Sequence, residues 1–223
     1  TNSNGQFKQD LLDIYSWNIN GLWSKIKSGA LDDFLNDVNP DILCLGETKI
    51  KEEQMKELTF PSIYHNYFDC CIPPHAGYSG VQILTKTEPI SWRWGIGRLE
   101  TDTEGWAITL EFEKFFLMNL YVPNAGENLV WLEHRIFTWD ATLHEYLETL
   151  WKEKPVIIVG DMNVAPEELD IWTPRGHSDS PGFTLFERHS FLKLLRVGFR
   201  DAYWDLHPDE RKYTWWYGPK CKL

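Results

Sequence analysis

The sequence has 223 residues, a net charge of −11 and an isoelectric point near 5.1. This length fits one domain with a large buried core, and we assign residues 10–223 to that domain, after a polar arm at residues 1–9. The negative charge argues against attraction of nucleic acid over the whole surface, because such binding relies on Lys and Arg that neutralise phosphates.

The four cysteines do not form a metal or disulfide pattern. They are Cys44, Cys70, Cys71 and Cys221, without the C-x-x-C spacing of zinc sites. We therefore predict reduced thiols in an intracellular protein. No apolar run approaches about 18 residues and no charged-then-apolar leader is present, so we expect neither a membrane span nor a secretory signal.

Strand and helix patterns alternate along the chain. Strand-like runs occur at residues 11–17, 41–47, 80–85, 90–95, 106–112, 115–122 and 155–161. Helical patterns lie at 31–38 and 129–151, and a third begins at Thr184 with Glu187 in capping-box spacing and ends at Gly198. Because the runs from 80 to 122 follow one another without helices, the pattern favours two packed sheets with helices outside over one doubly wound sheet.

Polar side chains with functional head groups follow several of the apolar runs. They are Asn18, Glu47, Tyr121, Asn124, Asp161 and Asn163. Singly, each is typical of a strand-end cap or a turn former. Strand ends in layered α/β proteins often meet in one crevice, however, so together they predict a functional site.

The chemistry of this set points to phosphate esters. Glu and Asp are hard oxygen ligands, and without a His/Cys set they favour Mg²⁺ or Mn²⁺ over zinc. Asn and Tyr can donate to phosphate oxygens or to a developing charge. One carboxylate that holds a metal and another that orients water suit phosphodiester hydrolysis. No G-x-S-x-G, Walker or dinucleotide motif is present.

In seven successive blocks the sequence resembles the exonuclease III-type apurinic/apyrimidinic (AP) endonucleases, within the endonuclease/exonuclease/phosphatase superfamily. The blocks are SWNINGL (16–22), DILCLGETK (41–49), GYSGV (77–81), LYVPNAG (120–126), GDMNVAPEELD (160–170), GFTLFER (182–188) and YTWW (213–216). YVPNAG and GFT-x-x-ER favour the AP endonuclease branch over lipid or inositol phosphatases. The resemblance implies a four-layer α/β sandwich, with two mostly antiparallel sheets flanked by helices.

The resemblance also implies catalytic roles for matching residues. Glu47 would bind the divalent metal, Mg²⁺ or Mn²⁺. Asp161 would orient or deprotonate the attacking water, and Asn163 would hold the same phosphate. Asn18 would lie beside the metal and the nucleophile, and Tyr121 would donate to the scissile phosphate.

Substrate-binding roles follow in the same way. Asn124 and Asn20 would contact the region of the phosphate, Lys49 would pair with the acidic group, and Tyr78 would touch the DNA backbone. The implied partner is double-stranded DNA with abasic sites, and the implied location is the nucleus in a eukaryote and otherwise the cytoplasm.

Two departures from the family pattern bear on these expectations. Gly46 stands where the family usually has Gln, and the added backbone freedom would hold Glu47 less firmly. After YTWW the family continues with a further Asp and a terminal Ser-Asp-His block, which are absent from the 223 residues; His177 and His207 read as loop histidines. We expect the second sheet to lack its C-terminal strands, and we expect self-association as a homodimer to cover the edge.

Three functions stay open on these residues. The first is a metal-dependent DNA repair nuclease that cuts 5′ to abasic sites, with 3′–5′ exonuclease or 3′-phosphodiesterase activity. The second is an impaired or inactive family member that binds DNA or a protein partner. The third is a phosphodiesterase or phosphatase that acts on a small molecule or a lipid.

Overall fold

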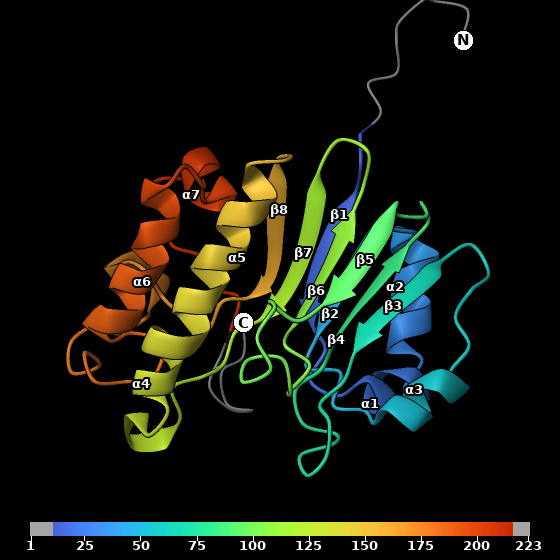
Figure 1. Cartoon of the computed structure of the whole chain (residues 1–223), viewed down its shortest axis with the longest axis horizontal. Helices are drawn as coiled ribbons and strands as arrows, with labels where there is room; N and C mark the ends of the chain where they lie inside the picture. Colours follow the sequence, from blue (N-terminus) through green and yellow to red (C-terminus); the bar gives the residue numbers. More distant parts are fainter. Residues whose placement is uncertain (1–10, 216–223) are drawn as a thin grey trace, which may run out of the picture. The chain divides into compact units, whose positions relative to one another are not determined.

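The computed structural model describes residues 11–215, which form two compact units (Figure 1). Among the described residues, the first unit comprises residues 11–122 together with Tyr146–Met162, and the second comprises Pro123–Glu145 and residues 163–215. The polar arm predicted at 1–9 lies outside the described residues. The assignment of residues 10–223 to one domain stays a prediction.

The first unit contains two four-stranded sheets (Figure 1). One has the order β1-β2-β4-β3, from β1 (Ile14–Asn18), β2 (Ile42–Gly46), β3 (His65–Asp69) and β4 (Val81–Thr85). The other has the order β5-β6-β7-β8, from β5 (Ser91–Trp94), β6 (Ala107–Glu111), β7 (Phe116–Tyr121) and β8 (Val156–Asp161). Only the pairs β1–β2 and β7–β8 are parallel, so both sheets are mostly antiparallel.

The alternation of side chains along each strand builds the layers. In β2, Leu43 and Leu45 face one way, toward a core shared with helices α1 (Leu22–Lys27), α2 (Ala30–Val38) and α3 (Glu52–Glu57). Ile42 and Cys44 face the other way and pack on the second sheet. Burial on both faces explains why β2 reads as a continuous apolar run.

The second sheet carries a helix on its outer side. In α5 (Ala141–Trp151), Tyr146 donates a hydrogen bond from its hydroxyl to Thr109 Oγ1 of β6 at 3.0 Å. Leu147 and Leu150 on the same helix are buried. Helices, two packed sheets and a helix therefore follow one another, which confirms the predicted class of two packed sheets flanked by helices.

The second unit is helical. It contains η1 (Glu127–Leu129), α4 (Leu132–His134), a π-helical turn η2 (Arg135–Asp140), η3 (Glu168–Asp170), α6 (Leu185–Arg196) and α7 (Ala202–Leu206). The capping box predicted at the start of α6 is present, since Glu187 N donates to Thr184 Oγ1. The helix predicted at 129–151 is present from Leu132 to Trp151, because α4, the π turn and α5 follow one another without a break in helical conformation; η1 precedes it.

No helix among residues 11–215 has both the length and the apolar character that a membrane crossing requires.

Candidate active site

The carboxyl ends of four strands define the candidate site in the first unit. Asn18 ends β1, Tyr121 ends β7 and Asp161 ends β8, while Glu47 follows β2 directly. Asn18 is in register with Gly46 of β2, and Tyr121 with Asp161. Since both parallel pairs end here, polar residues far apart in the sequence come together.

Asn18 connects the two carboxylates. Its Nδ2 donates to Glu47 Oε1 at 2.9 Å and to Asp161 Oδ2 at 3.1 Å. One amide nitrogen therefore bridges side chains that are 114 positions apart in the sequence (161 minus 47). The shared donor partly offsets the repulsion between two neighbouring negative charges.

Lys49 completes the surroundings of Glu47. Its ammonium lies 2.6 Å from Glu47 Oε2 and donates to Asn20 Oδ1, also at 2.6 Å. The backbone N–H of Asn20 in turn donates to Asn18 Oδ1 at 3.2 Å. The chain of contacts closes on itself, so these four side chains fix one another.

The protonation of the site follows from these contacts. Burial raises the pKa of Glu47, but hydrogen bonds from Asn18, Lys49 and Tyr121 and the charge of Lys49 outweigh burial and hold this pKa below its usual value. Burial and the nearby Glu47 carboxylate raise the pKa of Tyr121 far above its usual value. Glu47 is therefore an anion beside a phenol that keeps its proton.

Tyr78 lies at the exposed margin of this group. Its side chain is exposed, and burial of the hydroxyl together with the charges of Glu104 and Glu47 raises its pKa. The negative charge of Glu47 therefore contributes to the raised pKa of Tyr78.

The backbone of the site is strained. Asn20, Glu47 and Lys49 have φ values of 45°, 52° and 49°, in the left-handed region that costs a non-glycine residue about 1–3 kcal/mol. Hydrogen bonds hold the conformation: Gly21 N donates to Glu47 O at 2.8 Å, and Lys49 N to Ser79 O at 2.8 Å. This conformation accompanies the contacts that join the side chains of Glu47, Lys49 and Asn20.

Gly46 does not loosen Glu47 as the sequence suggested. It is the last residue of β2 and is paired with both neighbouring strands, opposite Asn18 and Val81. Ile19 N also donates to Gly46 O at 3.0 Å. Strand pairing removes the backbone freedom that an isolated glycine would have, so that expectation was wrong.

The second unit holds the two remaining predicted residues. Asn124 Nδ2 donates to Asn163 Oδ1 at 3.0 Å, and Asn124 Oδ1 accepts from Gly126 N at 2.8 Å. Asn163 has a φ of 46°, so it too adopts the left-handed conformation. The two amides therefore lie together, each on its own loop.

Two arginines that the sequence did not single out support these loops. Arg135, almost fully buried, donates from Nη1 to Pro123 O at 2.5 Å and from Nε to Asp140 at 2.9 Å. Arg188 Nε donates to Pro166 O at 2.7 Å. Their acceptors are main-chain carbonyls 12 and 22 positions away, and no local sequence pattern marks such contacts.

The donor set suits a magnesium-like ion. Within residues 11–215, no group of three His, Cys, Asp or Glu side chains could hold a metal by itself. Mg²⁺ commonly uses one or two carboxylates and takes its other ligands from water and substrate phosphate. Glu47 and Asp161, joined through Asn18, fit that requirement, and a zinc site would need a different set.

The candidate histidines have local partners in the second unit. His177 Nδ1 lies 3.0 Å from Ser180 Oγ, and His207 Nδ1 lies 3.2 Å from Glu210. Both contacts are three residues apart in sequence, as expected for loop histidines.

Comparisons with known proteins agree with this geometry. The sequence model of the Endonuclease/Exonuclease/phosphatase family matches residues 15–221. The chain is 43% identical over 208 residues to the DNA repair nuclease APEX1 of Danio rerio, covering 92% of this chain and 66% of that protein. It is 38% identical over 206 residues to an exodeoxyribonuclease of Bacillus subtilis, covering 92% and 80%.

A solved structure shows the same fold. The AP endonuclease of Leishmania major superposes with a TM-score of 0.78 at 27% identity, over 88% of this chain and 70% of that one. The chain thus spans about two thirds of the zebrafish protein and somewhat more of the Leishmania protein.

Proposed function

Because the chain belongs to the endonuclease/exonuclease/phosphatase family, we propose that it is a divalent-metal-dependent nuclease that hydrolyses phosphodiester bonds in DNA. The observation that carries the proposal is the Asn18 amide held between the Glu47 and Asp161 carboxylates, with Tyr121 beside them. Two anions fixed at this spacing can serve a cation and a water molecule, and a simple strand cap would not need both.

Each side chain has a role in this proposal. Asp161 accepts a proton from the attacking water, and Asn18 orients the Asp161 carboxylate for that task. Tyr121 keeps its proton and donates a hydrogen bond to the phosphate as charge develops there. Lys49 and Asn20 hold Glu47 in place.

A bound Mg²⁺ or Mn²⁺ at Glu47 would polarise the phosphate and stabilise the departing oxygen. In the second unit, the paired amides of Asn124 and Asn163 carry N–H donors of the kind that suit phosphate oxygens.

The substrate in this proposal is double-stranded DNA with an abasic site, cut on the 5′ side, with trimming of 3′ ends as a further activity. The names of the relatives support it, since one is a DNA repair nuclease, one an exodeoxyribonuclease and one an AP endonuclease. An intracellular location, the nucleus in a eukaryote, follows from that substrate. Self-association as a homodimer stays a prediction that sedimentation at several concentrations can test.

The first test is cleavage of a labelled duplex that carries one abasic-site analogue, with Mg²⁺ and then with EDTA. Asp161→Asn and Glu47→Ala are each expected to lower the cleavage rate by about 10³-fold or more. When residues act as one catalytic unit, the loss of any one of them removes most of the rate enhancement that the unit provides. Lys152→Ala is the control, because the Lys152 ammonium forms a surface ion pair with Glu148. Equal rates in wild type and both site variants would refute the proposal.

The same experiment separates the alternatives. Binding of the duplex without any metal-dependent cleavage would favour the inactive, DNA-binding member of the family. Cleavage of a small phosphodiester with no effect on DNA would favour the phosphatase branch.

A further inference from the structure

The loop that carries Asn124 has no cation with which to neutralise a phosphate. Residues 123–134 contain Glu127 and Glu133 but neither Lys nor Arg. The next residue, Arg135, is 3% exposed and engaged with Asp140 and the Pro123 carbonyl. If this loop contacts nucleic acid, it does so by something other than charge.

The same loop presents an indole. Trp131 is 61% exposed, whereas Trp139, eight residues on, is completely buried and serves the core. Packing in the core therefore does not explain Trp131. Tryptophan buries a large apolar area when its face is covered, so an exposed ring in a loop without Lys or Arg is suited to a flat apolar ligand.

The indole is fixed to the loop, not left free to rotate. A Cβ placed on Gly126 would lie 2.8 Å from Trp131 Cδ1 and 3.2 Å from a methyl of Val130, so the ring rests where a side chain at 126 would stand. Trp131 N donates to Ala125 O at 2.8 Å. A ring held in this way loses little conformational entropy when a ligand stacks on it.

The loop ties this ring to the paired amides of the second unit. Gly126, on which the ring rests, donates its N–H to Asn124 Oδ1 at 2.8 Å. Asn124 in turn donates to Asn163. A group that stacks on Trp131 is thus held by the same short segment that positions the two amides.

We propose that Trp131 is a stacking platform for an unpaired nucleobase of the DNA substrate, next to the phosphate that Asn124 contacts. The inference rests on the proposed function and adds a substrate preference to it. Inside a paired duplex both faces of each base are covered, and exposing one costs unstacking energy. DNA with a frayed 3′ end or a mismatch already offers a free face, so the site prefers it to fully paired DNA.

Binding by stacking differs from binding by charge in how the affinity depends on salt. Aromatic contacts with bases tolerate any sequence and release few counterions, so they contribute affinity that depends little on salt. An acidic protein with a net charge of −11 gains from a contact of this kind, because it does not require attraction over the whole surface.

The test measures Kd by fluorescence anisotropy in EDTA for two DNA probes of one sequence, one fully paired and one with an unpaired 3′-terminal base. Trp131→Ala is expected to weaken binding of the unpaired probe about tenfold and to leave the paired probe within about twofold. Trp131→Phe, which keeps a ring, restores most of the preference. Trp151→Ala, at another exposed indole, is the control and leaves both values unchanged.

The salt series adds a second readout. The ratio of the two Kd values in wild type is expected to stay constant as salt rises, while both Kd values increase. Equal losses on both probes for Trp131→Ala, or no loss on either, would overturn the inference.

Cleavage assays keep the two proposals apart. Metal-dependent cleavage that Asp161→Asn abolishes, together with an unchanged probe preference in Trp131→Ala, refutes the stacking platform alone. Binding that prefers the unpaired probe through Trp131, without any metal-dependent cleavage, refutes the nuclease and supports the platform.

Discussion

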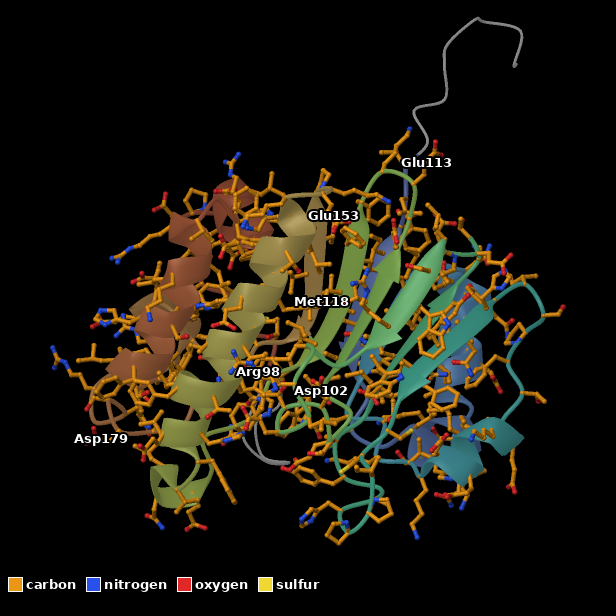
Figure 2. All side chains as sticks on the ribbon, viewed as in Figure 1. Arg98, Asp102, Glu113, Met118, Glu153 and Asp179 are labelled. Carbon is orange, nitrogen blue, oxygen red and sulfur yellow. The ribbon has the colours of Figure 1, made fainter. Side chains whose placement is uncertain are left out.

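Asp69 is a buried carboxyl, at the end of β3, for which the proposed reaction has no use. Its Oδ2 is buried without a hydrogen-bond partner among the described residues. Burial, with the charge of Asp102, raises the pKa of Asp69 from 3.8 to about 7, against opposing hydrogen bonds from the backbone of Ala107 and Cys70. Asp102, labelled in Figure 2, is itself held by the N–H groups of Ile96 and Gly97 at 2.7 and 2.8 Å.

Asp69 should therefore make stability depend on pH. Unfolded Asp69 ionises near pH 4 and folded Asp69 near pH 7, so the folded protein binds more protons between these values. Its contribution is fully present below about pH 4 and is lost as the pH rises to about 7, by up to about 4 kcal/mol in the free energy of unfolding. Urea unfolding of wild type and Asp69→Asn across this range measures the difference.

The Asn variant has no proton to lose, so its curve is expected to be flatter from pH 4 to 7 and to lie above that of the wild type at pH 8. Parallel curves would show that Asp69 ionises at an ordinary pKa.

At the scale of the strand, two glycines hold matching places one residue before a carboxylate. Gly46 precedes Glu47 at the end of β2, and Gly160 precedes Asp161 in β8. A Cβ on Gly160, where φ is 119°, would lie 1.9 Å from Leu120 O of β7, whereas a Cβ on Gly46 would meet nothing within 4 Å. The neighbouring strand therefore requires glycine at position 160, whereas it leaves room for a Cβ at position 46.

Gly160→Ala is expected to destabilise the protein by about 2–5 kcal/mol, because the β7–β8 pairing must open to admit the methyl group. Gly46→Ala is the matched control and is expected to be neutral or to stabilise by about 0.5–1 kcal/mol through the unfolded chain. Chemical denaturation of both variants measures this. A similar loss of unfolding free energy in both variants would show that the end of β8 moves to admit the methyl group and that the close approach to Leu120 O is not decisive.

Elements were predictable where the sequence pattern is strong. All seven strand-like runs are strands, and Thr184 and Glu187 cap α6 as their spacing indicates. β3, with the sequence HNYFD, was missed because it is an edge strand with neither alternation nor an apolar run. The π-helical turn within the helix predicted at 129–151 was not predicted, because no sequence pattern marks it; Arg135 in this turn donates hydrogen bonds to Pro123 O and to Asp140.

Some features of the candidate site could likewise be predicted from the sequence, and others could not. Strand ends predicted which side chains would gather, because the carboxyl ends of β1, β2, β7 and β8 must meet in such a fold. The left-handed backbone at Glu47 and Lys49 was not predictable, since neither residue favours it. The supporting Arg188 lies in a recognised block, but its acceptor is a distant carbonyl.

At the scale of the two sheets, one buried amide joins them. Asn119 of β7 is fully buried and donates from Nδ2 to Leu45 O of β2 at 3.0 Å and to Gln82 O of β4 at 3.1 Å. The hydrophobic residues packed between the sheets include Ile83 and Leu117. The amide therefore sets how one sheet lies on the other, which apolar contacts alone specify weakly.

Asn119→Leu is expected to lower the free energy of unfolding by about 1–3 kcal/mol, because the sheets lose this polar link between them. Met118→Leu, a volume-conserving change at the next residue of β7, is the control and should cost less than about 1.5 kcal/mol. Urea unfolding with equal m-values would show that both variants keep the fold. If Asn119→Leu lowers the free energy of unfolding no more than Met118→Leu does, the Asn119 hydrogen bonds do not stabilise the packing of the two sheets.

The left-handed residues of the site have one more consequence. Four of these residues adopt backbone conformations that glycine adopts without strain: Asn20, Glu47, Lys49 and Asn163. A mutation to glycine at one of these positions thus relieves strain as it removes the functional group, so stability alone does not protect the site against genetic drift. A variant survey scored only by protein abundance would pass over these positions, and one scored by cleavage would find them.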